Sequence, residues 1–163
     1  MTALVGGGLT AAVPAHAALV DLDCAGLATA HYSPGLTNTV QTVAITGSAI
    51  YYPCVSSDLT LVSGTSTVSA VGVASCTSGG FAGTAVFHWN NGGTTTANYT
   101  ATINAREDGE AVTTATGEVV SGEFVGDTYT SVNVLTTLQV LACETSGLTS
   151  VTGPRDILLT DLG

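Results

Sequence analysis

The sequence predicts an all-β domain, and three observations support that prediction. Threonine, valine, glycine, alanine and serine dominate the 163 residues, a composition that favours pleated strands and turns over helices. Apolar and polar residues alternate along many segments, whereas the spacing of an amphipathic helix is nearly absent. Turn residues separate these segments at short intervals. We therefore expect one antiparallel Greek-key β-sandwich of the immunoglobulin-like type, with a closed barrel as the alternative.

Two hairpins are the clearest local predictions. In Asn98–Ala105 apolar residues alternate with Asn and Thr, which is typical of a strand with one buried face. Thr84–Trp89 is its expected partner, because Asn90–Gly93 between them supplies the residues of a tight turn. A second turn at Arg106–Glu110, with Asp-Gly at its tip, leads into Ala111–Val120. The remaining expected strands are Ala28–Tyr32, Val40–Tyr52, Val68–Cys76, Glu118–Val125, Thr128–Cys143 and Asp156–Asp161.

Two segments depart from simple alternation. The long Thr128–Cys143 segment changes parity near Thr136, which predicts a bulge or a strand that bends between sheets. Three glycines interrupt Gly117–Gly126, which predicts sharp turns or bulges around Phe124. Both segments are expected to lie within one domain, because no linker or repeat divides the chain.

The first seventeen residues have the features of a secretory signal. A short apolar stretch precedes the helix-breaking Pro14 and the small residues Ala15 and Ala17, which suit signal peptidase. No cation precedes Arg106, so we expect the basic start of the signal to lie upstream. Residues 1–17 are predicted to be a cleaved remnant, and residues 18–163 to form one secreted domain. No apolar segment reaches the roughly 20 residues of a membrane span.

Charge and composition exclude several functions. Twelve acids, two arginines and no lysine give a net charge of −10, which excludes nucleic-acid binding because phosphates need Lys and Arg. Without lysine, phosphate-binding loops and Schiff-base chemistry are also excluded. There is no G-x-S-x-G motif, and no spacing singles out a catalytic triad. We expect a protein that is not an enzyme, with no catalytic residue and no cofactor.

Four cysteines remain in the predicted mature chain. An even number in a secreted domain predicts two disulfides, for which three pairings are possible. We favour Cys54–Cys76, which closes a local loop, together with Cys24–Cys143, which joins an early strand to a late one. Cys and His residues do not have zinc-finger spacing.

Aromatic residues are the candidate binding residues. Phe87, Trp89 and Tyr99 form the main group, and Tyr51 and Tyr52 form a second one. Core packing is the favoured interpretation, because one Trp beside a disulfide is usual in sandwiches. The alternative is an exposed platform that stacks on sugar rings, with polar edges from the adjacent turn.

No metal site is expected. His88 lies on the strand face opposite its aromatic neighbours, so we expect it to face solvent; a metal site with His31 would require adjacent strands. The acids at positions 21–23 and 107–110 lack the spacing of a calcium-binding EF-hand loop. An exposed turn explains the second group better.

Several motifs resemble those of small secreted all-β proteins of actinobacteria whose function is uncharacterised. They are Tyr32–Leu36, Trp89–Gly92, the glycine pattern of Gly117–Gly126, and Leu141–Cys143. The resemblance covers most of the predicted mature chain and implies no site residues. In composition and acidity the chain is also similar to enediyne-carrier apoproteins, whose disulfides instead close short loops. The subtilisin-inhibitor family shares two disulfides, but its reactive loop has no match here.

These observations predict a secreted, non-enzymatic binding or surface-interaction module. The partner is not specified by the sequence; cell-wall polysaccharide, a secreted protein and an apolar small molecule are the candidates. The second prediction is an extracellular carrier that holds an apolar small molecule in a cleft. An enzyme or an enzyme inhibitor is the third.

Overall fold

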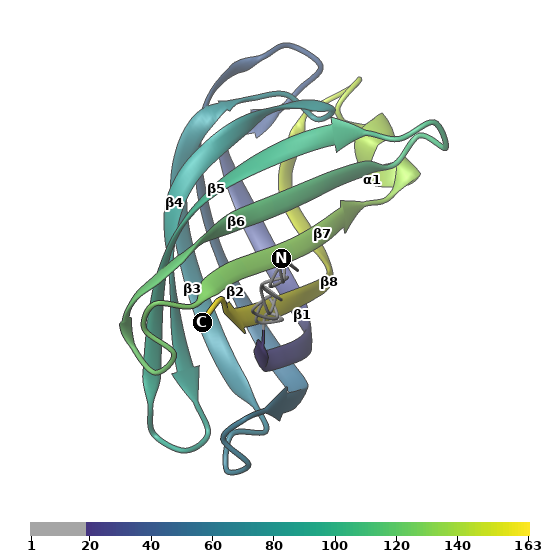
Figure 1. Ribbon diagram of the computed structural model, residues 1–163. Coiled ribbons are helices and arrows are strands. Elements are labelled where there is room, and N and C mark those ends of the chain that lie inside the picture. The colour runs from purple at the N-terminus through teal and green to yellow at the C-terminus, as the bar shows by residue number, and fades with distance from the viewer. Residues whose placement is uncertain (1–18) are drawn as a thin grey trace, which may run out of the picture.

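The computed structural model describes residues 19–163, which form a closed antiparallel barrel of eight strands (Figure 1). Every strand pairs with its neighbour in the chain, and the last strand pairs with the first. The predicted signal remnant at residues 1–17 lies outside the described residues. The elements are β1 (Leu19–Leu36), β2 (Gln41–Ser56), β3 (Gly64–Ala74), β4 (Ser78–Trp89), β5 (Thr94–Ala105), β6 (Ala111–Gly122), β7 (Thr128–Leu135), α1 (Thr137–Ala142) and β8 (Leu148–Asp161).

The all-β prediction is confirmed, but the immunoglobulin-like sandwich is wrong. Antiparallel pairing of β1 with β8 begins at Leu19 and Asp161 and continues to Leu36 and Leu148, which closes the sheet on itself. Alternation shows that each strand has one buried face. It does not show whether that face meets a second sheet or the axis of a barrel, and both architectures satisfy it.

Most predicted strands are longer or shifted in the structure, among them β1 and β8, and two predicted segments are divided differently. Glu118–Val125 is not a separate strand: β6 extends to Gly122, and a turn with Phe124 at φ 63° follows. The predicted Thr128–Cys143 strand is divided into β7 and α1. Its parity change marks the N-cap of α1, where the Thr136 side chain accepts from the backbone of Gln139 and the Gln139 side chain accepts from the backbone of Thr136. This reciprocal capping box ends the strand and starts the helix.

The two predicted hairpin turns are confirmed. Asn90–Gly93 connects β4 to β5, and Arg106–Glu110 connects β5 to β6. Gly92 and Gly109 adopt φ values of 87° and 89°, which residues with a side chain rarely adopt. The glycines at the tips therefore allow both tight reversals.

The interior of the barrel has two unlike halves. The packed half, nearest the start of β1 and the end of β8, is filled by large buried side chains, among them Leu22, Tyr51, Phe87, Trp89, Tyr129 and Leu159. The cavity half, nearest α1, has small residues at inward positions, among them Ala28, Ala30, Ala101, Ala115 and Gly153. Figure 1 shows α1 at one end of the barrel, just beyond the end of β7.

The disulfides differ from the predicted pairing. The structure joins Cys24 to Cys54 and Cys76 to Cys143. Cys24 and Cys54 are direct cross-strand partners on β1 and β2. The predicted Cys54–Cys76 bond is wrong because all 11 residues of β3 run between these two cysteines, a distance of about 36 Å along an extended strand. Cys54 and Cys76 are close in the sequence, but β3 between them places the two cysteines at opposite ends of the barrel.

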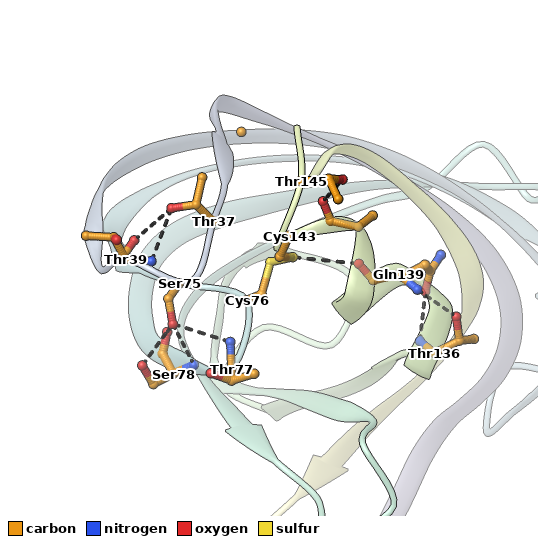
Figure 2. The surroundings of a disulfide bond; sticks show 12 residues. Thr37, Thr39, Ser75, Cys76, Thr77, Ser78, Thr136, Gln139, Cys143 and Thr145 are labelled. Carbon is orange, nitrogen blue, oxygen red and sulfur yellow. Dashed lines mark hydrogen bonds between the residues drawn. A yellow bond between two sulfur atoms is a disulfide. The ribbon is translucent and has the colours of Figure 1, made fainter. Parts of the chain in front are cut away.

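The Cys76–Cys143 disulfide holds the mouth of the cavity half (Figure 2). Cys76 lies in the turn between β3 and β4, and Cys143 caps the end of α1. The backbone N–H of Cys76 also donates to the carbonyl of Thr37 in the β1–β2 turn, at 2.9 Å. Three connections at this end of the barrel are thus tied together.

Two disulfides indicate an oxidising compartment, because such bonds rarely persist in the cytosol. No helix between residues 19 and 163 is long and apolar enough to cross a membrane. The six-residue α1 is the helix that this region contains.

Candidate functional site

The cavity half encloses a cavity of about 60 Å³, and all eight strands contribute to its walls. An eight-stranded barrel is just wide enough for inward side chains to fill it. At Ala101 and Ala115 the inward side chain is a methyl group, and at Gly153 there is none. The cavity therefore results from the small size of the residues at these positions, since the same eight strands also enclose the packed half.

Arg155 is the charged residue in the cavity wall. Its side chain is on β8 with a residual exposure of 7%, and its Nε donates to the Asn133 side-chain oxygen at 3.1 Å. Asn133 is its direct partner across the β7–β8 ladder. Within residues 19–163 the one ion pair joins Arg106 to Glu110, at 3.7 Å. Arg155 is therefore buried without a carboxylate partner.

A glycine makes room for a tyrosine beside this arginine. Gly26 on β1 pairs with Tyr51 on one side and with Arg155 on the other. A Cβ atom at Gly26 would lie 2.5 Å from the Tyr51 ring, so only glycine lets the ring cross β1. The Tyr51 hydroxyl lies 3.1 Å from the Ser66 hydroxyl. Burial raises the pKa of Tyr51, and the Arg155 charge partly opposes that rise.

The charge of Arg155 also influences two further tyrosines of the interior, Tyr32 and Tyr99. Burial raises the pKa of Tyr99 to about 12, and it also raises the pKa of Tyr32. The charge of Arg155 acts in the opposite direction on both. The Tyr129 hydroxyl is buried with no hydrogen-bond partner. The interior thus combines one cation with the phenol groups of Tyr32, Tyr51 and Tyr99, which remain protonated and able to donate.

The predicted aromatic binding residues lie mostly inside the barrel. Tyr51, Phe87, Trp89 and Tyr99 are buried, whereas Tyr52 is 74% exposed on the outer face. Phe87 stacks on Trp89 with ring centroids 5.2 Å apart and is 5.9 Å from Tyr51. The favoured interpretation as core packing describes this arrangement, whereas a sugar-stacking platform would require exposed ring faces. Of the five residues, Tyr99 lines the cavity.

The Asn-Asn-Gly-Gly turn beside Trp89 closes the packed half. The Asn90 side chain accepts from the backbone of Val62 and Ser63, at 2.8 and 3.1 Å. The Asn91 amide donates to Asp58 and Glu123, at 3.2 and 3.0 Å. These bonds join the β2–β3, β4–β5 and β6–β7 connections. They give the motif a structural role in place of the predicted polar edge of a sugar platform.

The two histidines of residues 19–163 lie on the outer surface and do not form a metal pair. His31 is on β1 and His88 is on β4, both with exposed side chains. Strands β2 and β3 lie between them in the barrel, so the adjacency that a shared metal would need is absent. The described part of the chain contains no group of three potential metal ligands.

Arg155 and Asn133 were not among the residues singled out from the sequence. A signal for Arg155 was present, because it shares the inward parity of Ile157 and Leu159 on one strand. Asn133 has no comparable signal, because it resembles any polar residue of an alternating strand. No family model, curated protein or solved structure matches the chain.

Proposed function

We propose that this protein is a secreted, non-enzymatic binding protein that holds a small organic molecule inside its barrel. The observation that supports this is the cavity of about 60 Å³, where apolar walls meet a few converging polar groups. Small-molecule sites typically combine these two features. Secretion is supported by the two disulfides and by the signal-like character of residues 1–17.

The closed sheet favours interior binding over a surface-interaction role. A partner that adds a strand requires a free sheet edge, and the β1–β8 ladder occupies both outer edges of the eight-stranded meander. The wall of the cavity also contains hydroxyl groups but no His, Asp, Glu or Cys side chain. The hydroxyls therefore have no adjacent general base, which supports binding without catalysis.

The ligand reaches the cavity where β7 and β8 separate. Pairing between these strands ends at Asn133 and Arg155. Beyond that point Val134, Gly153 and Pro154 line the cavity, and we call these three residues the β7–β8 seam. α1 covers part of this region, because the Gln139 amide donates to the carbonyl of Thr152 at 3.5 Å.

The test fills the cavity and measures binding. Ala115→Ile adds three carbon atoms at an inward position, and Ala44→Ile makes the same change on the outer face. Ligand-observed NMR would be run with a panel of three- to six-carbon alcohols, amides and carboxylates. We expect the wild type and Ala44→Ile to bind the same compounds, and Ala115→Ile to lose at least about tenfold in affinity. Equal binding by both variants would place the ligand elsewhere, and no binding by the wild type would contradict the proposed function.

A further inference from the structure

We propose that the ligand is a small organic carboxylate whose anionic group is bound by Arg155 in the barrel interior. This inference rests on the proposed function, because it assumes that the cavity is the binding site. It adds the chemical class of the ligand and the residue that recognises it.

The first argument is the location of the positive charge. The chain has twelve acids and two arginines, yet one of these arginines is buried in the barrel. Burial of an unpaired charge is strongly unfavourable, and a guanidinium cannot avoid that penalty by losing its proton. None of the abundant carboxylates pairs with Arg155 within residues 19–163. A bound anion would supply the missing negative charge.

The second argument is the number of free donors. A guanidinium has five N–H groups in a planar fork. Asn133 accepts from Nε, and the Tyr51 hydroxyl is a second hydrogen-bonding neighbour of the guanidinium. The remaining N–H groups are left for another acceptor. Arginine binds carboxylates through two parallel hydrogen bonds. Tyr32 and Tyr99 also line the cavity, and their hydroxyl groups are further donors.

The third argument is the size and chemistry of the remaining wall. A cavity of about 60 Å³ admits a compound of only a few heavy atoms. Tyr32, Phe81 and Val151 provide apolar surface around it, which suits a short alkyl chain and not a fully hydrated inorganic ion. One cation matches one negative charge. A short alkyl carboxylate neutralises the charge of Arg155, accepts two parallel hydrogen bonds from the guanidinium, and places its alkyl chain against the apolar lining.

The test compares butyrate with butyramide, which has almost the same shape but no charge. Isothermal titration would use the oxidised protein, with phosphate as a third probe. We expect the wild type to bind butyrate at least about tenfold more tightly than butyramide or phosphate. Arg155→Gln is expected to remove this preference, and Arg155→Lys to keep part of it. Arg106→Gln is the matched control, because it removes the same charge from the exposed β5–β6 turn and should leave the preference intact.

The outcomes separate the inference from the function on which it rests. Equal binding of butyramide and butyrate would overturn the role of Arg155 while the interior binding function stands. Stronger binding of phosphate would overturn the organic character of the ligand. Failure of all compounds in the alcohol, amide and carboxylate panel would contradict the binding function itself. The comparison of butyrate with butyramide uses the wild-type protein. It therefore tests the preference for a carboxylate even if Arg155→Gln fails to fold.

Discussion

The same eight strands enclose the two halves of the barrel, but the two interiors are opposite in character. In the packed half, rings from β2, β4 and β7 meet, with Phe87 lying 5.9 Å from both Tyr51 and Tyr129. In the cavity half, Ala101 on β5 and Ala115 on β6 continue the inward faces of the same barrel. The packed half is also closed by side-chain hydrogen bonds between loops, whereas a disulfide and a short helix cover the other end. The comparison indicates that one half supplies stability and the other supplies space.

The division explains how a barrel of this size tolerates a buried, unpaired arginine. The buried charge of Arg155 destabilises the cavity half. The aromatic cluster of the packed half stabilises the fold because it buries a large apolar surface. Aromatic pairs of this kind add roughly 0.5–1.5 kcal/mol each beyond their buried area. The cavity and the buried charge of Arg155 lower the stability of the cavity half. The aromatic packing at the other end of the same strands offsets this loss.

The largest expected effect comes from removing a ring in the packed half. Phe87→Ala should lower the free energy of unfolding by about 3–5 kcal/mol, because the buried ring leaves a cavity among its neighbours. Phe81→Ala is the matched substitution in the cavity half, where the half-buried ring already faces open space. It should cost about 1–2 kcal/mol. Chemical denaturation measures both, and equal losses would contradict the division into halves.

The disulfides provide a second comparison of similar size. By loop closure, removal of either bond should cost roughly 4 kcal/mol, since the separations of 30 and 67 residues enter only logarithmically. Their local effects should differ. Cys76→Ser with Cys143→Ser should speed amide hydrogen exchange in α1, because the bond holds the end of that helix. Cys24→Ser with Cys54→Ser should leave α1 protected, because β1 and β2 remain paired. Faster exchange of α1 in both double variants would argue against a specific role of the Cys76–Cys143 bond at the mouth.

The smallest effect concerns a carboxyl group beside the packed half. The pKa of Asp127 is raised from 3.8 to about 6, first by burial and then by Asp21 and Asp161. The folded state therefore favours the protonated form, so this group lowers stability as the pH rises from about 4 to 6. Asp127→Asn should raise the Tm by a few degrees at pH 7.5 and leave it almost unchanged at pH 3, as measured by calorimetry. Asp23→Asn, at an exposed position, is the control. A lower Tm of Asp127→Asn at pH 7.5 would contradict the assignment.

Local features of the fold were predictable from the sequence, and closure was not. The alternation in Asn98–Ala105 and the turn at Asn90–Gly93 identified β5 and its hairpin with β4. β1 was predicted as five residues, Ala28–Tyr32, but runs from Leu19 to Leu36. Its inward positions include glycine and alanine, which give a weak hydrophobic alternation. The small residues that form the cavity thus also concealed the strand that closes the barrel.

The candidate site was predictable only in part, for the same reason. Aromatic residues attract attention in a sequence, and four of the five proposed binding residues do lie in the interior. Most of them fill the packed half. The cavity forms because Ala115 and Gly153 have little or no side chain. Small residues of this kind do not make a recognisable sequence motif. The pairing of Arg155 with Asn133 depends on the β7–β8 register, which local composition does not specify.

The order of the strands also has a consequence for how the chain reaches this structure. Seven ladders join strands that follow one another, and only the β1–β8 ladder joins distant segments. Local hairpins form at low loop-closure cost, whereas pairing Leu19 with Asp161 requires the whole meander to be in place. Until that final step, the growing sheet has two unpaired edges that could recruit another chain. Closure of the barrel is therefore also the step that removes its exposure to aggregation.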